Sequence, residues 1–199
     1  YENVLLGNYA SESEDKITGM FVTTQQYSNI FLPRAGENIN NTADEKRRAL
    51  NTFKSNLMSM RFNSNTEVID YVKTFSTKFA SIIELSLNST GPVFIFSNWL
   101  TYGVEPLGII LKACGLAEFD KEDTGNGRYF IWSSETKTKD RDGTLIKKAR
   151  NTFNSLENSD GSKLKIILGT RSVMEGVSFK NVKQFHITEP WWNESRIEQ

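Results

Sequence analysis

A short apolar run followed by a hydroxyl-rich turn is the strongest candidate for chemistry in this chain. Lys165 to Leu168 fits a strand that is buried on both faces, and Thr170, Arg171 and Ser172 follow it directly. Ligand-binding groups in open α/β sheets collect at the carboxyl ends of the strands. Hydroxyl groups, a guanidinium and backbone N–H groups all bind phosphate oxygens, and Gly176 lets the chain come close to a ligand. We expect this turn to contact phosphate groups.

Further candidates lie near the end of the chain and after an earlier apolar run. The final run reads Glu189-Pro190-Trp191-Trp192-Asn193-Glu194-Ser195-Arg196-Ile197-Glu198-Gln199. The Trp191 ring can stack on a base, which contributes about 1–3 kcal/mol, although a Trp beside Pro more often anchors a domain interface. Arg196 can pair with a nucleotide or with an acidic group across a cleft. Ser97 and Asn98 follow the run 93–96, where phosphate contact and turn capping are both reasonable.

These side chains must be positioned by alternating strands and helices. Continuous apolar runs predict strands at Val93 to Phe96, Arg128 to Ser133, Leu164 to Leu168 and Gln184 to Ile187. Apolar residues at helical spacing predict helices from Ser64 to about Leu87, from about Pro106 to Cys114, and from Leu145 to Leu156. This alternation predicts an α/β fold, with a mostly parallel sheet and helices on both faces.

Residues 1–62 are less regular than the rest of the chain. Met20 to Thr24 is a candidate short strand, and Ala35 to Asp44 is expected to be a loop. Ala43 to Met60 is expected to be a helix, whose apolar side carries Leu50, Phe53, Leu57 and Met58. Its basic residues are more often a solvated face than a binding patch. We therefore expect a connector or insertion with one helix at 1–62, and a separate α/β domain at 63–199.

Composition narrows the classes of function. The 199 residues are 38% hydrophobic and 24% charged, and the formal net charge is +0, so any nucleic-acid site must be local. Cys114 and His186 are the only residues of their types, which excludes an internal disulfide and predicts no metal site. We expect Cys114 in the core and His186 in the core with a backbone hydrogen bond. The sequence offers no membrane span, so we expect an intracellular protein.

The block from Leu164 to Ser178 resembles motif V of superfamily 2 helicases and translocases. That motif is a strand ending in Thr, a short helical stretch, and a Gly followed two residues later by a polar side chain. The resemblance implies that Thr170 contacts nucleic acid and that Gly176 and Ser178 lie beside the nucleotide. Together with the candidates named above, the expected nucleic-acid contacts are Ser97, Asn98, Thr170, Arg171, Ser172 and Trp191. The expected ATP contacts are Glu175, Gly176, Ser178, Arg196 and Gln199. Many relatives have Asp where this chain has Ser178.

Other segments indicate a smaller group of proteins within this superfamily. The runs 94–99 and 153–161 and the Pro-Trp-Trp-Asn run resemble the poxvirus-type nucleoside triphosphatases and early-transcription-factor helicases of large DNA viruses. Gln199 would be the first residue of motif VI, and the arginine fingers of that motif are expected beyond it. The resemblance implies the C-terminal lobe of a viral, transcription-linked helicase or translocase, folded as a RecA-like three-layer sandwich.

Such a lobe would not hydrolyse ATP alone. The chain has no G-x-x-x-x-G-K-[ST] segment and no Asp-Glu pair after a strand. We therefore expect no catalytic residue here, and we expect ATP and Mg²⁺ to be bound mainly by an N-terminal lobe of the same polypeptide. DNA is favoured over RNA as the track, RNA polymerase is a candidate partner, and a viral protein would reside in the virion core or a cytoplasmic virus factory.

Two other classes of function stay open. One is a non-catalytic RecA-like interaction module that binds RNA polymerase or another protein. The other is a nucleotide-dependent transferase, which is less favoured because no glycine-rich phosphate loop follows the first strand.

Overall fold

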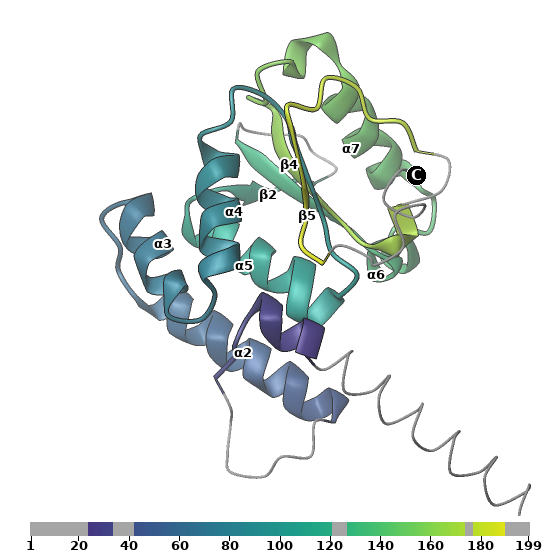
Figure 1. The fold of residues 1–199 in the computed structure, drawn as a ribbon. Helices are drawn as coiled ribbons and strands as arrows, with labels where there is room; N and C mark the ends of the chain where they lie inside the picture. Colours follow the sequence, from purple (N-terminus) through teal and green to yellow (C-terminus); the bar gives the residue numbers. More distant parts are fainter. Residues whose placement is uncertain (1–23, 34–41, 121–126, 174–176, 190–199) are drawn as a thin grey trace, which may run out of the picture.

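The computed structural model describes residues 24–33, 42–120, 127–173 and 177–189 (Figure 1). Its strands form one five-stranded sheet in the order β2-β3-β4-β1-β5. The strands are β1 (Val93–Phe96), β2 (Ala117–Glu118), β3 (Arg128–Trp132), β4 (Leu164–Gly169) and β5 (Gln184–Ile187). All the pairings are parallel. The predicted parallel sheet is confirmed, and the two-residue strand β2 is an addition that the apolar pattern did not show.

Strand β1 lies in the middle of the sheet, between β4 and β5. Val93 is in register with Ile166 of β4 and with Gln184 of β5. All four residues of β1 are buried, because helices cover both faces of the central strands. This position requires a continuous apolar run, and the sequence provides one. The edge strand β5 is more exposed, and Phe185 lies largely in solvent.

Two helical layers enclose the sheet (Figure 1). One core cluster joins α4 and α5 to one face of β1 and β4, and a second cluster joins α7 to the opposite face. The helices are α2 (Ala43–Ser59), α3 (Asn65–Lys73), α4 (Thr77–Leu87), α5 (Glu105–Ala113), α6 (Ser134–Lys139) and α7 (Thr144–Asn154). Short helical turns follow at η1 (Leu100–Val104), η2 (Leu156–Asn158) and η3 (Arg171–Val173). The α/β three-layer arrangement of a RecA-like fold is confirmed.

The helix α2 begins and ends close to the predicted positions. Thr42 and Glu45 form a capping box at its start. Leu50, Phe53 and Leu57 are buried as expected, but Met58 is exposed. The prediction for Met58 was wrong because it follows Leu57 directly, and one residue turns an α-helix by about 100°.

The single helix expected from Ser64 to Leu87 is two helices. Ser64 caps α3 as predicted, since its hydroxyl accepts a hydrogen bond from the backbone of Glu67 at 3.3 Å. A turn then separates α3 from α4, because the Ser76 hydroxyl accepts from the backbone N–H of Phe79 at 2.9 Å and starts a new helix. The helical spacing of apolar residues continues across this break, which is why the pattern did not reveal it.

Three further boundaries differ from the sequence prediction. Helix α7 ends at Asn154, and Leu156 is exposed rather than buried. Thr24 is helical, so the candidate strand at 20–24 is wrong at its last residue, and its other residues lie outside the described ranges. The expected loop at 35–44 overlaps the start of α2 at Ala43.

The N-terminal segment packs on the same core as the sheet. Residues 24–29 are helical, and Ile30 and Leu32 are buried with Phe53 of α2 and Val93 of β1. The division into 1–62 and 63–199 stays a prediction. In the described part of the chain, no helix is long and apolar enough to cross a membrane.

Candidate functional site

Four neighbouring strands are each followed by a Ser or Thr residue at the same edge of the sheet, which we call the carboxyl edge. Ser133, Thr170, Ser97 and Thr188 follow β3, β4, β1 and β5, and all four are buried. The backbone N–H groups of Thr170, Ser97 and Thr188 donate to the last carbonyl of the neighbouring strand, at 3.1, 3.0 and 3.0 Å. The parallel pairing therefore extends one residue beyond the strands and fixes the residues where the loops begin.

Two of these loops meet above β1 and β4. The Arg171 Nε atom donates to the Asn98 Oδ1 atom at 3.0 Å, and the Arg171 side chain is exposed. The Thr170 and Ser172 hydroxyl oxygens are 3.1 Å apart. Lys137 of α6 donates from its Nζ atom to the Ser172 carbonyl at 2.5 Å. The structure thus brings together four residues singled out in the sequence, and it adds Lys137, which the sequence did not indicate.

A buried carboxylate lies beneath the Asn98 loop. Glu189 follows Thr188 and is 4% exposed. Its Oε1 atom accepts hydrogen bonds from Ser97 Oγ at 2.8 Å, from Thr188 Oγ1 at 2.6 Å and from Asn29 Nδ2. Its Oε2 atom accepts from the Asn98 backbone N–H at 2.8 Å. These five residues form the Glu189 cluster, in which the donors compensate the cost of burying the charge.

Lys78 supplies a cation beside the Glu189 cluster. Its Nζ atom donates to Asn29 Oδ1 at 3.0 Å and to the Thr188 carbonyl at 3.2 Å. Burial lowers the pKa of Lys78, and the nearby Glu189 charge opposes part of that effect. The Asn29 amide also donates to the Tyr102 carbonyl at 3.0 Å. Asn29 therefore connects the N-terminal segment to η1, to α4 and to the end of β5.

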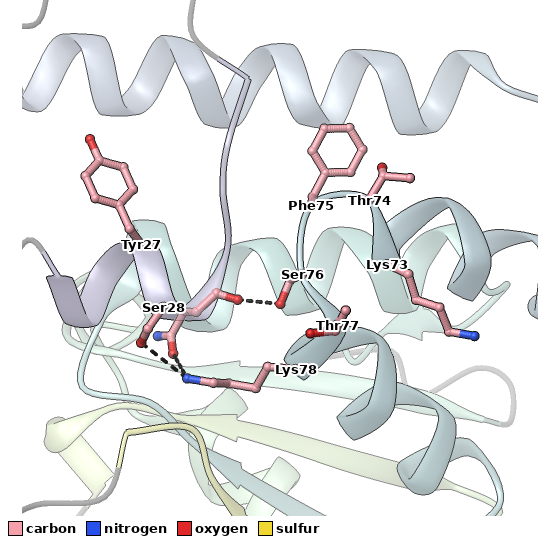
Figure 2. Close-up of a pocket in the computed structure, with 9 residues that line it drawn as sticks. Tyr27, Ser28, Lys73, Thr74, Phe75, Ser76, Thr77 and Lys78 are labelled. Carbon is pink, nitrogen blue, oxygen red and sulfur yellow. Dashed lines mark hydrogen bonds between the residues drawn. The ribbon is translucent and has the colours of Figure 1, made fainter.

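A shallow hollow of about 290 Å³ opens beside Asn29 (Figure 2). It is lined by Tyr27, Ser28, Asn29, Lys73, Thr74, Phe75, Ser76, Thr77 and Lys78. The Ser76 hydroxyl donates to the Asn29 carbonyl, and Lys78 reaches Ser28 at 3.4 Å. The exposed Lys73 ammonium pairs with Asp70 at 2.8 Å. The hollow therefore marks the place where the N-terminal segment is fastened to the start of α4, and we assign no ligand to it.

The remaining predicted site residues are not in this group. Ser178 is exposed, and its carbonyl accepts a hydrogen bond at 2.9 Å from the side chain of Asn154, the last residue of α7. The structure does not place Ser178 among the hydrogen-bonded residues around Thr170. The other residues expected to contact ATP or nucleic acid lie outside the described ranges, namely Glu175, Gly176, Trp191, Arg196 and Gln199.

Sequence reasoning missed three residues that organise this edge. Glu189 could have been found, since it is an acidic residue directly after a predicted strand and belongs to the quoted final run. Asn29 and Lys78 carried no such signal. They come from a helical turn and a helix start far away in the sequence, and only the fold brings them to Glu189.

The single His and the single Cys lie away from these contacts. Cys114 is buried as predicted, and burial raises the pKa of its thiol to about 11, so the thiol is protonated at neutral pH. His186 is only half-buried, and its Nε2 atom lies 3.1 Å from the Gln184 side-chain oxygen. The expected fully buried His with a backbone hydrogen bond was therefore wrong. Burial lowers the pKa of His186.

Comparison with known proteins identifies viral relatives, although no protein-family model matches the chain. A protein of Acanthamoeba polyphaga mimivirus, named as an ATP-dependent RNA helicase, is 35% identical over 142 residues, which are 69% of this chain and 24% of that protein. A protein of Invertebrate iridescent virus 3, named as a helicase, is 34% identical over 138 residues, 64% of this chain and 13% of the relative. Nucleoside triphosphatase I of Choristoneura biennis entomopoxvirus is 28% identical over 154 residues, 75% of this chain and 21% of the relative.

These relatives confirm the resemblance to viral helicases and poxvirus-type nucleoside triphosphatases. The chain spans about a quarter or less of the length of each of them. What this chain does within a whole protein is therefore a matter for proposal.

Proposed function

We propose that this chain is the C-terminal RecA-like lobe of a viral ATP-dependent helicase or translocase, and that its carboxyl edge contacts the backbone of a nucleic-acid strand. The main supporting observation is the similarity, over two thirds of the chain, to a viral protein named as an ATP-dependent helicase. The Asn98–Arg171 contact at the carboxyl edge supports the second part of the proposal. The carboxyl edge is where open α/β sheets bind ligands.

Exposed cations and hydroxyl groups give this edge the chemistry that a phosphate backbone requires. Arg171 is exposed and attached through its Nε atom to Asn98, and Lys137 is exposed beside Ser172. A guanidinium and an ammonium neutralise phosphate charge, and the Thr170 hydroxyl can bind a phosphate oxygen. Ser97 has no exposed surface, so its role in this proposal is to hold the Asn98 loop. Trp191 is proposed to stack on a base.

The proposed ATP contacts are Glu175, Gly176, Ser178, Arg196 and Gln199, which would form one wall of a cleft shared with an N-terminal lobe. Among the described residues, no three His, Cys, Asp or Glu side chains are grouped so that they could hold a metal ion. We assign Mg²⁺ and most of the ATP contacts to the other lobe, because the chain has no G-x-x-x-x-G-K-[ST] segment and no Asp-Glu pair after a strand. ATP hydrolysis would supply the free energy, and the residues of this chain would hold the strand while the lobes close and open.

The direct test is nucleic-acid-stimulated ATPase activity of the full-length protein that contains this chain. Arg171→Ala and Thr170→Ala are expected to weaken the stimulation and to leave the folded state intact, because Arg171 is exposed and Thr170 holds only a local hydroxyl contact. Lys183→Ala is the matched control, since Lys183 is exposed just before β5, at the opposite edge of the sheet. Unchanged stimulation in both variants would contradict the proposed contact, and the absence of any nucleic-acid-stimulated ATPase activity in the unmodified protein would favour a non-catalytic interaction module.

The same assay tests whether the bound strand is DNA or RNA. We propose DNA, although the mimivirus relative is named as an RNA helicase. DNA and RNA strands of the same sequence should be compared, and stimulation by RNA alone would reverse this part of the proposal. A link to transcription and to RNA polymerase is also proposed, and its test is whether polymerase subunits copurify with the full-length protein from infected cells.

A further inference from the structure

We infer that Glu189 is a positioning residue that sets the orientation of Arg171 through Asn98. This inference rests on the proposed function, because it takes Arg171 as a contact to the nucleic-acid backbone. It assigns a role to a buried carboxylate that the phosphate contacts themselves do not use.

Glu189 fixes the Asn98 backbone. The Glu189 Oε2 atom accepts from the Asn98 backbone N–H at 2.8 Å and from its Nδ2 atom at 3.4 Å. The carboxylate is 4% exposed, so water competes little for these hydrogen bonds. Because the same oxygen accepts from the backbone and from the side chain, it orients the Asn98 amide as well as its main chain.

Asn98 in turn orients Arg171. Since its Nδ2 atom faces Glu189, the Oδ1 atom of the same amide faces away from it, and Arg171 donates its Nε–H to that Oδ1 atom at 3.0 Å. A guanidinium held at Nε keeps its plane fixed, which reduces the entropy lost when it binds a phosphate. Glu189 thus acts on Arg171 through Asn98.

Glu189 is itself held by hydrogen bonds from several segments. Its Oε1 atom accepts from Asn29, Ser97 and Thr188, which lie in three separate segments. Ser97 is itself packed tightly against η1, because a Cβ atom added at Gly103 would lie 2.0 Å from Ser97 Oγ. These contacts hold the carboxylate in place beside Asn98.

The experiment is a double-mutant cycle on the affinity of the full-length protein for a fluorescein-labelled single-stranded DNA oligonucleotide of mixed sequence. Glu189→Gln keeps the size of the side chain but replaces one acceptor oxygen by an NH₂ donor, which must face groups that now donate to it. We expect Glu189→Gln to weaken binding about tenfold, as expected for the loss of one charge-assisted contact. In the Arg171→Ala background the same change should have almost no further effect, because the two residues act through one contact.

A change that only loosened the fold would behave differently. Asn158→Ala is the matched control, since Asn158 is a fully buried polar residue of η2 that accepts a hydrogen bond from Leu164, the first residue of β4, at the opposite edge of the sheet from Arg171. Its effect on affinity should be small and equal in both backgrounds. The dependence of affinity on salt gives a second readout, because Glu189→Gln should lower the slope of the logarithmic plot by about 1, as Arg171→Ala does.

The outcomes separate the inference from the proposed function. If Arg171→Ala leaves affinity unchanged, the proposed phosphate contact is wrong, and the positioning role of Glu189 is wrong with it. If Arg171→Ala weakens binding but Glu189→Gln has no effect, or has the same effect in both backgrounds, the positioning role alone is overturned. If Glu189→Gln does not fold, Asn98→Ala breaks the same connection one step nearer to Arg171. The double-mutant cycle is then measured with Asn98→Ala, a change at a partly buried residue, and interpreted in the same way.

Discussion

Each of the two edges of the sheet contains one buried polar residue that organises the loops around it. The two residues differ in how far along the sequence their hydrogen-bond partners lie. At the amino edge, Asn158 is fully buried and bonds both backbone groups of Leu164, at 2.9 and 3.0 Å, and the Lys163 N–H at 3.0 Å. All its partners lie within six residues. At the carboxyl edge, Glu189 accepts from residues that include Asn29, 160 positions away. Asn158 closes a local loop, whereas Glu189 joins segments that are distant in the sequence.

This difference shows where sequence patterns can locate functional positions. Substitution of Asn158 removes hydrogen bonds within one loop. Substitution of Glu189 removes hydrogen bonds that connect the N-terminal segment, β1 and β5. The candidate phosphate contacts lie on the edge with long-range connections. We therefore expect substitutions in the Glu189 cluster to change both stability and binding, and substitution of Asn158 at the amino edge to change stability alone.

The largest effect is expected for Glu189→Ala in the 199-residue chain. Its removal leaves donors from Asn29, Ser97 and Asn98 buried without their acceptor. The free energy of unfolding should fall by about 3 kcal/mol in urea titrations followed by circular dichroism. Glu157→Ala is the control, because the Glu157 side chain is exposed and its removal should leave the free energy of unfolding almost unchanged. Equal losses of unfolding free energy in Glu189→Ala and Glu157→Ala would contradict the structural role that we give to the Glu189 cluster.

Gly103→Ala tests how tightly the carboxyl edge is packed. The new Cβ atom would lie 2.0 Å from Ser97 Oγ and 2.7 Å from Ser97 Cβ, so the loop after β1 must move. We expect a loss of about 2 kcal/mol in the free energy of unfolding. At Gly115 no atom lies within 4 Å of an added Cβ, and Gly115→Ala should cost about 1 kcal/mol, through its φ of 86° alone. A smaller loss at Gly103 than at Gly115 would contradict the tight packing around Ser97.

Asn158→Ala tests the amino edge. The substitution leaves the backbone groups of Leu164 without partners, and we expect the free energy of unfolding to fall by about 1.5 kcal/mol. The affinity of the full-length protein for an oligonucleotide should stay within a factor of about two, because the lost contacts are local. A tenfold loss of affinity would show that the two edges are coupled.

The smallest effect is expected from pH, and it concerns the strand that leads to Glu189. The pKa of His186 lies below its ordinary value of 6.5 because of burial. Below pH 6.5 the unfolded chain therefore binds more protons than the folded one, and stability is lost as the pH falls from about 7 towards the folded pKa. His186→Gln should reduce the loss of unfolding free energy measured between about pH 7 and 5.5, and this reduction should be smaller than the effect of Asn158→Ala. An unchanged pH dependence would show that His186 does not titrate differently in the folded state.

The sequence predicted the parts of this molecule that depend on local patterns. The apolar run at Val93 to Phe96 identified the central strand, and the residues after two strands identified Ser97, Asn98 and the loop at Thr170. The break at Ser76 could not be seen, because apolar spacing continues through it. Asn29 and Lys78 could not be assigned either, since their partners are set by the packing of α4 and of the N-terminal segment on the sheet.

The central claim is that the carboxyl edge of the sheet contacts the nucleic-acid backbone. Its most direct test is the salt dependence of oligonucleotide affinity for the full-length protein, compared between Arg171→Ala and the amino-edge variant Lys183→Ala. We predict that Arg171→Ala lowers the slope of log affinity against log salt by about 1, and that Lys183→Ala leaves the slope unchanged. An unchanged slope for Arg171→Ala, or an equal change in the two variants, would contradict this account.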